Sequence, residues 1–177
     1  MYLIRELSLA EHQFITDLEI EITHYLTHLE APTGRGKSTF IINKFSENQK
    51  VLFLCALNVQ VEQIEKDYQE DTRVQCITNA NPCSKLSGQV VVCVYDKLTM
   101  LLERFDNIND YVLVVDEAHK VYQAAPYRPV AMSAIVDAIN KRKFKQVVTV
   151  SATFIPEIFP ATFNEQILIS HQPSEKP

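Results

Sequence analysis

The chain has 177 residues, of which 46% are hydrophobic and 22% are charged, and its formal net charge is −5. These values are typical of a single globular domain with a sizeable core, and the negative charge argues against a basic nucleic-acid-binding arm. No apolar run approaches the roughly 20 residues that span a membrane. Acidic residues and histidines interrupt every candidate signal sequence near the N-terminus, so we expect a cytoplasmic protein with no membrane contact.

Short apolar runs alternate with longer periodic segments along the chain, which is the pattern of an α/β fold. The predicted elements are, in chain order, a short helix opened by the capping box Ser8-Leu9-Ala10-Glu11, a strand at 25–30, a helix at 37–45, a strand at 50–55, a helix at 57–68, strands at 73–77 and 89–94, a helix at 96–105, a strand at 111–115, a helix at 129–141, and strands at 146–150 and 166–169.

The predicted strands are rich in Val, Leu and Ile and lack polar alternation. This composition indicates burial on both faces and therefore a parallel sheet between layers of helices. We predict an α/β fold with three layers, in which a mostly parallel β-sheet is flanked by helices. Residues 1–170 are expected to form a single domain, and the polar tail at 171–177, with its two prolines, is expected to be a linker.

Two of the three glycines lie in a single loop, Ala31-Pro32-Thr33-Gly34-Arg35-Gly36-Lys37-Ser38-Thr39. Its pattern is that of a phosphate-binding loop with Ala in place of the first Gly, and the following helix directs its positive end at the same anion. Lys37 is expected to reach the β- and γ-phosphates of a nucleotide, and the Ser38 hydroxyl to bind Mg²⁺. The residues expected to contact the nucleotide are Thr33, Gly34, Arg35, Gly36, Lys37, Ser38 and Thr39.

A second motif, Asp116-Glu117-Ala118-His119, directly follows the predicted strand at 111–115. Ligands of parallel sheets bind at the carboxyl ends of the strands, and an acid at the tip of a buried strand is costly unless it serves a cation or hydrogen bonds. We assign Asp116 to Mg²⁺ and Glu117 to the general base that polarises a water for attack on the γ-phosphate.

A third motif, Ser151-Ala152-Thr153, follows the predicted strand at 146–150. It lies about 30 residues after the acidic motif, which is the length of one crossover helix with its loops. The hydroxyls of Ser151 and Thr153 are expected to bond to His119 and to relay the nucleotide state to other parts of the protein. We place His119 with Lys37 and Glu117 in the catalytic set.

The four cysteines, Cys55, Cys76, Cys83 and Cys93, form no C-x-x-C pair. Two of them, Cys55 and Cys93, fall in predicted buried strands, where cysteine acts as a small apolar residue, so we expect neither a metal site nor a disulfide. The densest basic stretch, at 141–145, is expected to be a helix C-terminus, where cations complement the helix dipole.

Taken in order, Ala-Pro-Thr-Gly-Arg-Gly-Lys-Ser-Thr, Asp-Glu-Ala-His and Ser-Ala-Thr resemble motifs I, II and III of superfamily 2 helicases of the DEAH-box type. The resemblance covers residues 27–153 and is extended by the preceding Leu29-Glu30. It implies a RecA-like, P-loop ATP-binding domain that uses ATP and Mg²⁺ and hydrolyses ATP within a nucleic-acid helicase or translocase. The implied partner is DNA or RNA, with DNA slightly preferred.

Some segments match the family less well. The stretch at 55–63 takes the place of motif Ia, with Asn58 where Arg is common, and Val94-Tyr95-Asp96-Lys97-Leu98 resembles a Thr-Tyr-Asp-x-Leu motif that has lost its Thr. Gln13 is open to two interpretations, as the adenine-reading glutamine of one subgroup or as a polar helix residue. Arg35 departs from the usual small residue, and we expect its side chain to be solvated at the loop tip.

Members of this family have two RecA-like domains, and the second domain supplies an arginine finger and half of the nucleic-acid track. Nothing after Thr153 resembles those motifs, so the resemblance implies an N-terminal motor domain whose linker at 171–177 leads to an absent second domain. In isolation such a domain is expected to be nearly inactive. The alternative is a stand-alone nucleotide-binding module that regulates or binds a partner, and an unrelated phosphate-loop enzyme such as a small kinase is less favoured.

Overall fold

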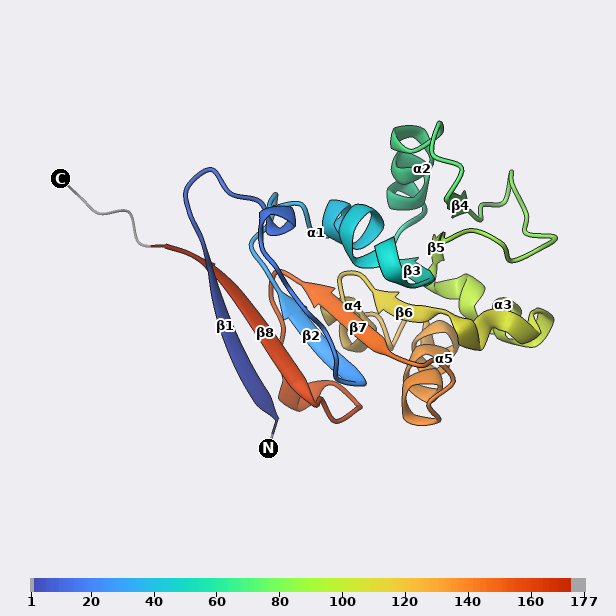
Figure 1. The fold of residues 1–177 in the computed structure, drawn as a ribbon. Helices are drawn as coiled ribbons and strands as arrows, with labels where there is room; N and C mark the ends of the chain where they lie inside the picture. The colour runs from blue at the N-terminus through green and yellow to red at the C-terminus, as the bar shows by residue number, and fades with distance from the viewer. Residues whose placement is uncertain (1, 173–177) are drawn as a thin grey trace.

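The computed structural model describes residues 2–172, which form one eight-stranded sheet in which every pairing is parallel (Figure 1). The spatial order of the strands is β1-β8-β2-β7-β6-β3-β5-β4. The strands are β1 (Leu3–Leu9), β2 (Leu26–Glu30), β3 (Val51–Cys55), β4 (Val74–Cys76), β5 (Val90–Val94), β6 (Val112–Val115), β7 (Val147–Ser151) and β8 (Glu165–His171). The predicted α/β fold with a parallel sheet is therefore confirmed.

Helices cover both faces of the sheet, so the fold has three layers (Figure 1). The helices are α1 (Lys37–Thr39), α2 (Asn58–Asp67), α3 (Leu98–Arg104), α4 (His119–Gln123) and α5 (Pro129–Asn140). A π turn at Phe40–Lys44 and a 3₁₀ turn at Phe45–Asn48 continue α1, so that the chain is helical throughout 37–48. One layer contains α3, α4 and α5, and the other contains α2 and the helical segment that begins with α1.

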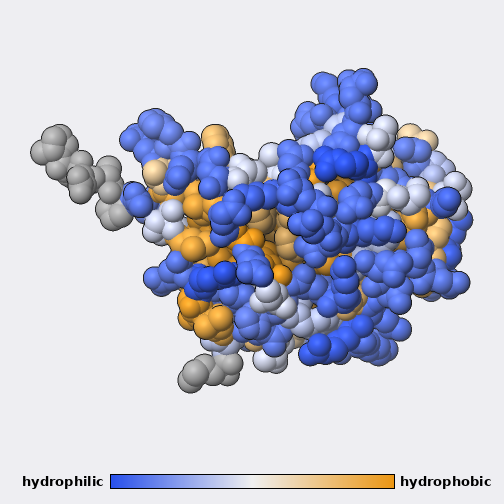
Figure 2. Space-filling view, in the orientation of Figure 1, coloured by the Kyte–Doolittle hydropathy of each residue, from blue (hydrophilic) through white to orange (hydrophobic). Residues whose placement is uncertain are grey.

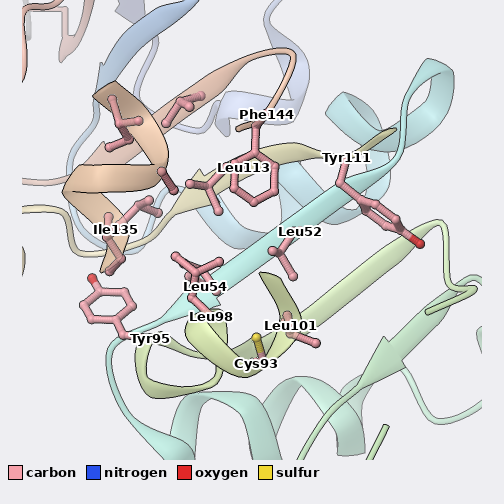
Figure 3. Packing of buried hydrophobic residues seen from close by; sticks show 14 of the residues in the cluster. Leu52, Leu54, Cys93, Tyr95, Leu98, Leu101, Tyr111, Leu113, Ile135 and Phe144 are labelled. Atoms are coloured by element: carbon pink, nitrogen blue, oxygen red, sulfur yellow. The ribbon is translucent and has the colours of Figure 1, made fainter. Parts of the chain in front are cut away.

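The central strands are apolar because both of their faces are covered. In β3, Leu52 and Leu54 pack into the cluster with α3 and α5, whereas Phe53 points to the opposite cluster, and all three are at most 1% exposed. Figure 3 shows Leu52 and Leu54 among the side chains of the first cluster. Burying one large apolar side chain stabilises a fold by about 1.5–3 kcal/mol, so this stacking on both sides accounts for the lack of polar alternation.

The predicted helix after Ser8 is wrong. Ser8 and Leu9 are the last residues of β1, which pairs with β8 from Leu3 opposite Glu165 to Leu9 opposite His171. The capping-box pattern is local, whereas the partner that makes this segment a strand lies about 160 residues away in the chain, a separation that local patterns do not report. The sequence also did not predict α4. The other predicted elements are present, with small shifts of their ends.

The sheet ends at β1, an edge strand whose Leu3 and Ile4 are each 53% exposed. Figure 2 shows apolar side chains gathered over this end of the sheet, around β1, β8 and β2.

His171, which was expected to belong to a linker, is the last residue of β8, and residues 173–177 of that predicted linker lie outside the described residues. No described helix is both long enough and apolar enough to cross a membrane.

Candidate nucleotide-binding site

The three predicted motifs meet at one edge of the sheet because they follow three adjacent strands. The phosphate-loop motif follows β2, the acidic motif follows β6, and Ser151 is the last residue of β7, which lies between these two strands. Since all three strands are parallel, their carboxyl ends lie side by side. The sheet therefore brings together residues that are more than 100 positions apart, such as Lys37 and Ser151.

The loop between β2 and α1 has two glycines in the left-handed conformation, as the predicted phosphate-binding loop requires. Gly34 and Gly36 have φ values of 73° and 79°, a region that strongly favours glycine, and Gly36 caps the helical segment. The Lys37 Nζ atom donates to the carbonyls of Ala31 and Pro32, each at 3.2 Å. The ammonium group thus lies inside the curve of the loop, where it can meet an anion.

The expectation that Arg35 is merely solvated is wrong. Its guanidinium donates to the carbonyls of Glu11 at 3.0 Å and Gln13 at 3.3 Å and lies 3.4 Å from His171 Nδ1. The Arg35 carbonyl in turn accepts from the Ile15 amide at 3.0 Å. These contacts join the tip of the phosphate loop to the segment after β1 and to the end of β8.

Gln13 is not a helix residue, because the segment that contains it is a turn. Its Oε1 accepts from the Ala10 amide at 2.9 Å, while its carbonyl accepts from Arg35. The polar-helix interpretation of Gln13 is therefore wrong, and the adenine-reading interpretation stays a prediction.

Asp116 is buried at the end of β6 with 6% of its surface exposed, and its amide donates to the Leu54 carbonyl at 2.9 Å. Burial, followed by the neighbouring Glu117 carboxylate, raises the pKa of Asp116 to about 6, whereas the positive charge of Lys37 acts in the opposite direction. Asp116 and Ser38 line one cavity of about 380 Å³. The structure therefore places Ser38 and Asp116 on one cavity, and the charge of Lys37 is close enough to act on the Asp116 carboxyl.

This donor set fits a magnesium ion. Among residues 2–172, no group of three or more His, Cys, Asp or Glu side chains gathers in a way that could hold a metal by itself. Mg²⁺, however, commonly uses only one or two protein oxygens and completes its shell with phosphate oxygens and waters. The Ser38 hydroxyl and the Asp116 carboxylate are oxygen ligands of this kind, and both residues line the shared cavity.

Glu117 and His119 lie beside each other in the turn after β6. Glu117 has a φ of 50°, a left-handed conformation that is uncommon for any residue other than glycine. His119 Nδ1 lies 3.3 Å from Glu117 Oε2 and 3.0 Å from Ser151 Oγ, so the predicted contact between His119 and Ser151 is present. The Ser151 hydroxyl donates to the Thr153 carbonyl, so His119 Nδ1 is the donor in its own bond with Ser151.

Thr153 does not make the predicted contact. Its amide donates to Ser151 Oγ at 3.1 Å and its carbonyl accepts from the same hydroxyl, while its side chain is exposed. No hydrogen bond joins the Thr153 hydroxyl to His119 within the part of the chain that the structure describes. Thr153 therefore orients Ser151 through its backbone.

Sequence reasoning missed the buried polar residues that support the site. His28 of β2 lies 2.7 Å from Thr149 Oγ1 through its Nδ1 and stacks on Phe154, with ring centroids 3.8 Å apart. Tyr95, which follows β5, donates its hydroxyl to the carbonyl of Asp116. In the sequence, these supporting residues are visible only as a polar or aromatic residue inside or directly after an apolar strand. This pattern does not identify the residue with which each of them forms a hydrogen bond.

The cysteines play the apolar role that was expected for two of them. Cys55 and Cys93 are 0% exposed in β3 and β5, and burial raises the pKa of each thiol far above its ordinary value. Cys76 and Cys83 are also buried and free.

The basic stretch at 141–145 follows the end of α5, where Lys141 Nζ pairs with Asp137 at 2.9 Å, so the interpretation as a helix C-terminus is confirmed.

Comparisons with solved structures agree with the observed fold. Two solved structures with similar folds are titled a hypothetical ATP-dependent RNA helicase from Sulfolobus tokodaii and the Hef helicase domain from Pyrococcus furiosus. The first is 18% identical, with a TM-score of 0.55, over 81% of this chain and 48% of that chain. The second is 20% identical, with a TM-score of 0.56, over 86% of this chain and 36% of that chain. At these identities the likeness shows the fold, and this chain spans less than half the length of either structure.

A comparison with curated proteins finds no match. The profile of the family described as "Type III restriction enzyme, res subunit" matches residues 6–156, which is most of the chain and includes all three motifs. Both the family match and the shared fold agree with the resemblance to superfamily 2 helicases. The chain therefore belongs to the family described as "Type III restriction enzyme, res subunit", and its RecA-like fold is the fold of the two helicase structures.

Proposed function

We propose that this chain is the ATP-binding half-site of an ATP-dependent nucleic-acid helicase or translocase. The observation that carries the proposal is that Ser38 and Asp116 border one cavity at the carboxyl ends of the central strands, with the charge of Lys37 close enough to act on Asp116. A cation, a hydroxyl and a carboxylate in this arrangement suit a nucleoside triphosphate with its magnesium ion.

Each residue has a distinct role in this proposal. The backbone of residues 33–39 surrounds the phosphates, and Lys37 neutralises charge on the β- and γ-phosphates. Ser38 and Asp116 hold Mg²⁺, which when bound supplies positive charge to the phosphate oxygens. Both side chains border the same cavity, which supports this assignment.

Glu117 is proposed as the residue that accepts a proton from the attacking water. The water oxygen bonds to the γ-phosphorus, the bond between that phosphorus and the bridging oxygen breaks, and the products are ADP and inorganic phosphate. His119 keeps the carboxylate in place, because its Nδ1 lies 3.3 Å from Glu117 Oε2 while it bonds to Ser151.

The partners are a nucleic acid and a second RecA-like domain. The two similar structures are titled as helicases and extend well beyond the part that this chain matches, which supports a larger motor. DNA is slightly preferred over RNA as the partner, and the assignment to the DEAH-box type and a cytoplasmic location stay predictions. With a net charge of −5, this chain is expected to bind strands weakly and with strong salt dependence.

The test is calorimetric titration of MgATP into the Lys37→Ala variant. We expect the variant to lose most of its affinity while keeping its fold, because among residues 2–172 Lys37 Nζ donates only to carbonyls of its own loop. Lys66→Ala, on the exposed side of α2, is the matched control and is expected to bind like the unmodified chain. Unchanged affinity in Lys37→Ala would rule out the nucleotide site.

The unmodified chain, assayed with and without a second RecA-like domain, distinguishes the helicase half-site from the alternative function. A stand-alone regulatory or partner-binding module would bind MgATP in this site but would gain no turnover when a second RecA-like domain is added. A helicase half-site gains turnover under that condition, because the second domain completes the charge compensation around the γ-phosphate.

A further inference from the structure

The hydroxyl of Tyr95 links the end of β5 to the backbone of the acidic motif. It donates to the Asp116 carbonyl and also lies 3.2 Å from the Glu117 carbonyl oxygen. The side chain is completely buried. A tyrosine hydroxyl has an ordinary pKa of about 10, so at neutral pH it keeps its proton and is a donor to these carbonyls.

A single donor that reaches both carbonyls restricts the conformation of the residue between them. Successive carbonyls point the same way in helical backbone and in opposite ways in extended backbone. The hydroxyl therefore meets both oxygens only when Glu117 has a helical-type conformation, and the observed φ of 50° is the left-handed form. That form is unfavourable for a residue with a Cβ and persists only where surrounding contacts maintain it.

The ring of Tyr95 is itself held in place by Arg128, the residue before α5. The Arg128 guanidinium lies over the ring with its carbon 5.6 Å from the ring centroid. It also donates to the Ala56 carbonyl at 2.9 Å and pairs with the Asp96 carboxylate. Arg128 thus joins the ends of β3 and β5, and the tyrosine between them has little freedom to move.

We propose that Tyr95 is a positioning residue for the proposed ATP hydrolysis, whose hydroxyl holds Glu117 in the left-handed conformation that aims its carboxylate at the attacking water. This inference rests on the proposed function of the site. It assigns Tyr95 no contact with the nucleotide, because its hydroxyl faces the two carbonyls. The loss of this hydroxyl is therefore expected to change the rate of hydrolysis and not the affinity for nucleotide.

Tyr95→Phe tests the inference, and Tyr111→Phe is a closely matched control. Tyr111 is also completely buried, and its hydroxyl donates to the Gly88 carbonyl at 2.8 Å. Figure 3 shows the two tyrosines at opposite ends of the same cluster. Each variant removes one buried hydroxyl that bonds to a backbone carbonyl, so the two are expected to lose similar global stability.

The first measurement is amide hydrogen exchange of Ala118 and Lys120, which donate to the Val150 and Glu117 carbonyls at 3.0 and 2.8 Å. In Tyr95→Phe these amides are expected to exchange about tenfold faster than in Tyr111→Phe, which is the effect of losing one net hydrogen bond from a local structure. Equal exchange in the two variants would overturn the inference, and this measurement requires no nucleotide.

The second measurement is single-turnover hydrolysis of MgATP with the 177-residue chain in excess, together with calorimetric affinity. Tyr95→Phe is expected to hydrolyse about tenfold more slowly than Tyr111→Phe at unchanged affinity. Equal rates in the two variants would refute the positioning role. If the unmodified chain bound no MgATP, the proposed function would fail instead, and the exchange measurement would still decide whether Tyr95 holds Glu117.

Discussion

His28 is expected to make the fold less stable in mild acid. The side chain is 0% exposed, stacks on Phe154 and lies 2.7 Å from Thr149 Oγ1 through its Nδ1. Burial lowers the pKa of His28 from 6.5 to about 3, so the folded chain keeps the ring neutral while the unfolded chain takes up a proton below pH 6.5. The unfolded state then binds more protons, and the free energy of unfolding falls as the pH falls.

The size of the effect follows from the two pKa values. One pKa unit corresponds to about 1.4 kcal/mol, so lowering the pH from about 7.5 to 4.5 removes about 2.5 kcal/mol of stability through this one group. The loss levels off once the pH reaches about 3, the folded-state pKa of His28, because the folded chain then binds the proton as well. Phe154 directly follows the Ser-Ala-Thr motif, so the same titration weakens the support of that motif.

Urea unfolding over this pH range measures the effect in three proteins. In the His28→Gln variant the side chain at position 28 no longer titrates. This variant is expected to show a flatter dependence of stability on pH than the unmodified chain. His12→Gln is the control, because His12 is exposed, and it is expected to keep the unmodified slope. If His28→Gln kept the full pH dependence, the burial argument would be refuted.

Two further predictions concern catalysis. Glu117→Gln is expected to keep MgATP affinity and lose hydrolysis, because the substitution preserves the size of the side chain and removes the base. A turnover assay of the protein joined to its second domain checks this, and turnover near the parental rate would contradict it. The 177-residue chain alone is expected to hydrolyse ATP very slowly, because an arginine finger contributes on the order of 10³–10⁵ in rate and no candidate finger follows Thr153. Rapid hydrolysis stimulated by single strands, measured with the monomeric chain, would contradict the half-site interpretation.

Local patterns in the sequence were enough to predict most of the fold. Buried strands such as β3 and β5 are uninterrupted apolar runs, and apolar runs of this kind have a stable place only between two layers of helices. The positions of the motifs relative to those runs then placed Lys37, Asp116 and Ser151 at the same edge of a parallel sheet, and the structure has them there.

The sequence alone determined which residues are proposed to carry the chemistry, because a phosphate-loop pattern, an acidic strand tip and their order are readable over a few neighbouring positions. Only the tertiary structure decided how those residues are supported. β1 is a strand because β8 lies beside it, Arg35 bonds to residues 11 and 13 because β1 returns the chain to the phosphate loop, and Tyr95 reaches Asp116 because β5 and β6 flank β3. Such contacts join positions 20 to 160 residues apart, and a side chain's partner across that separation depends on the packing of the whole sheet and not on its neighbours in the chain.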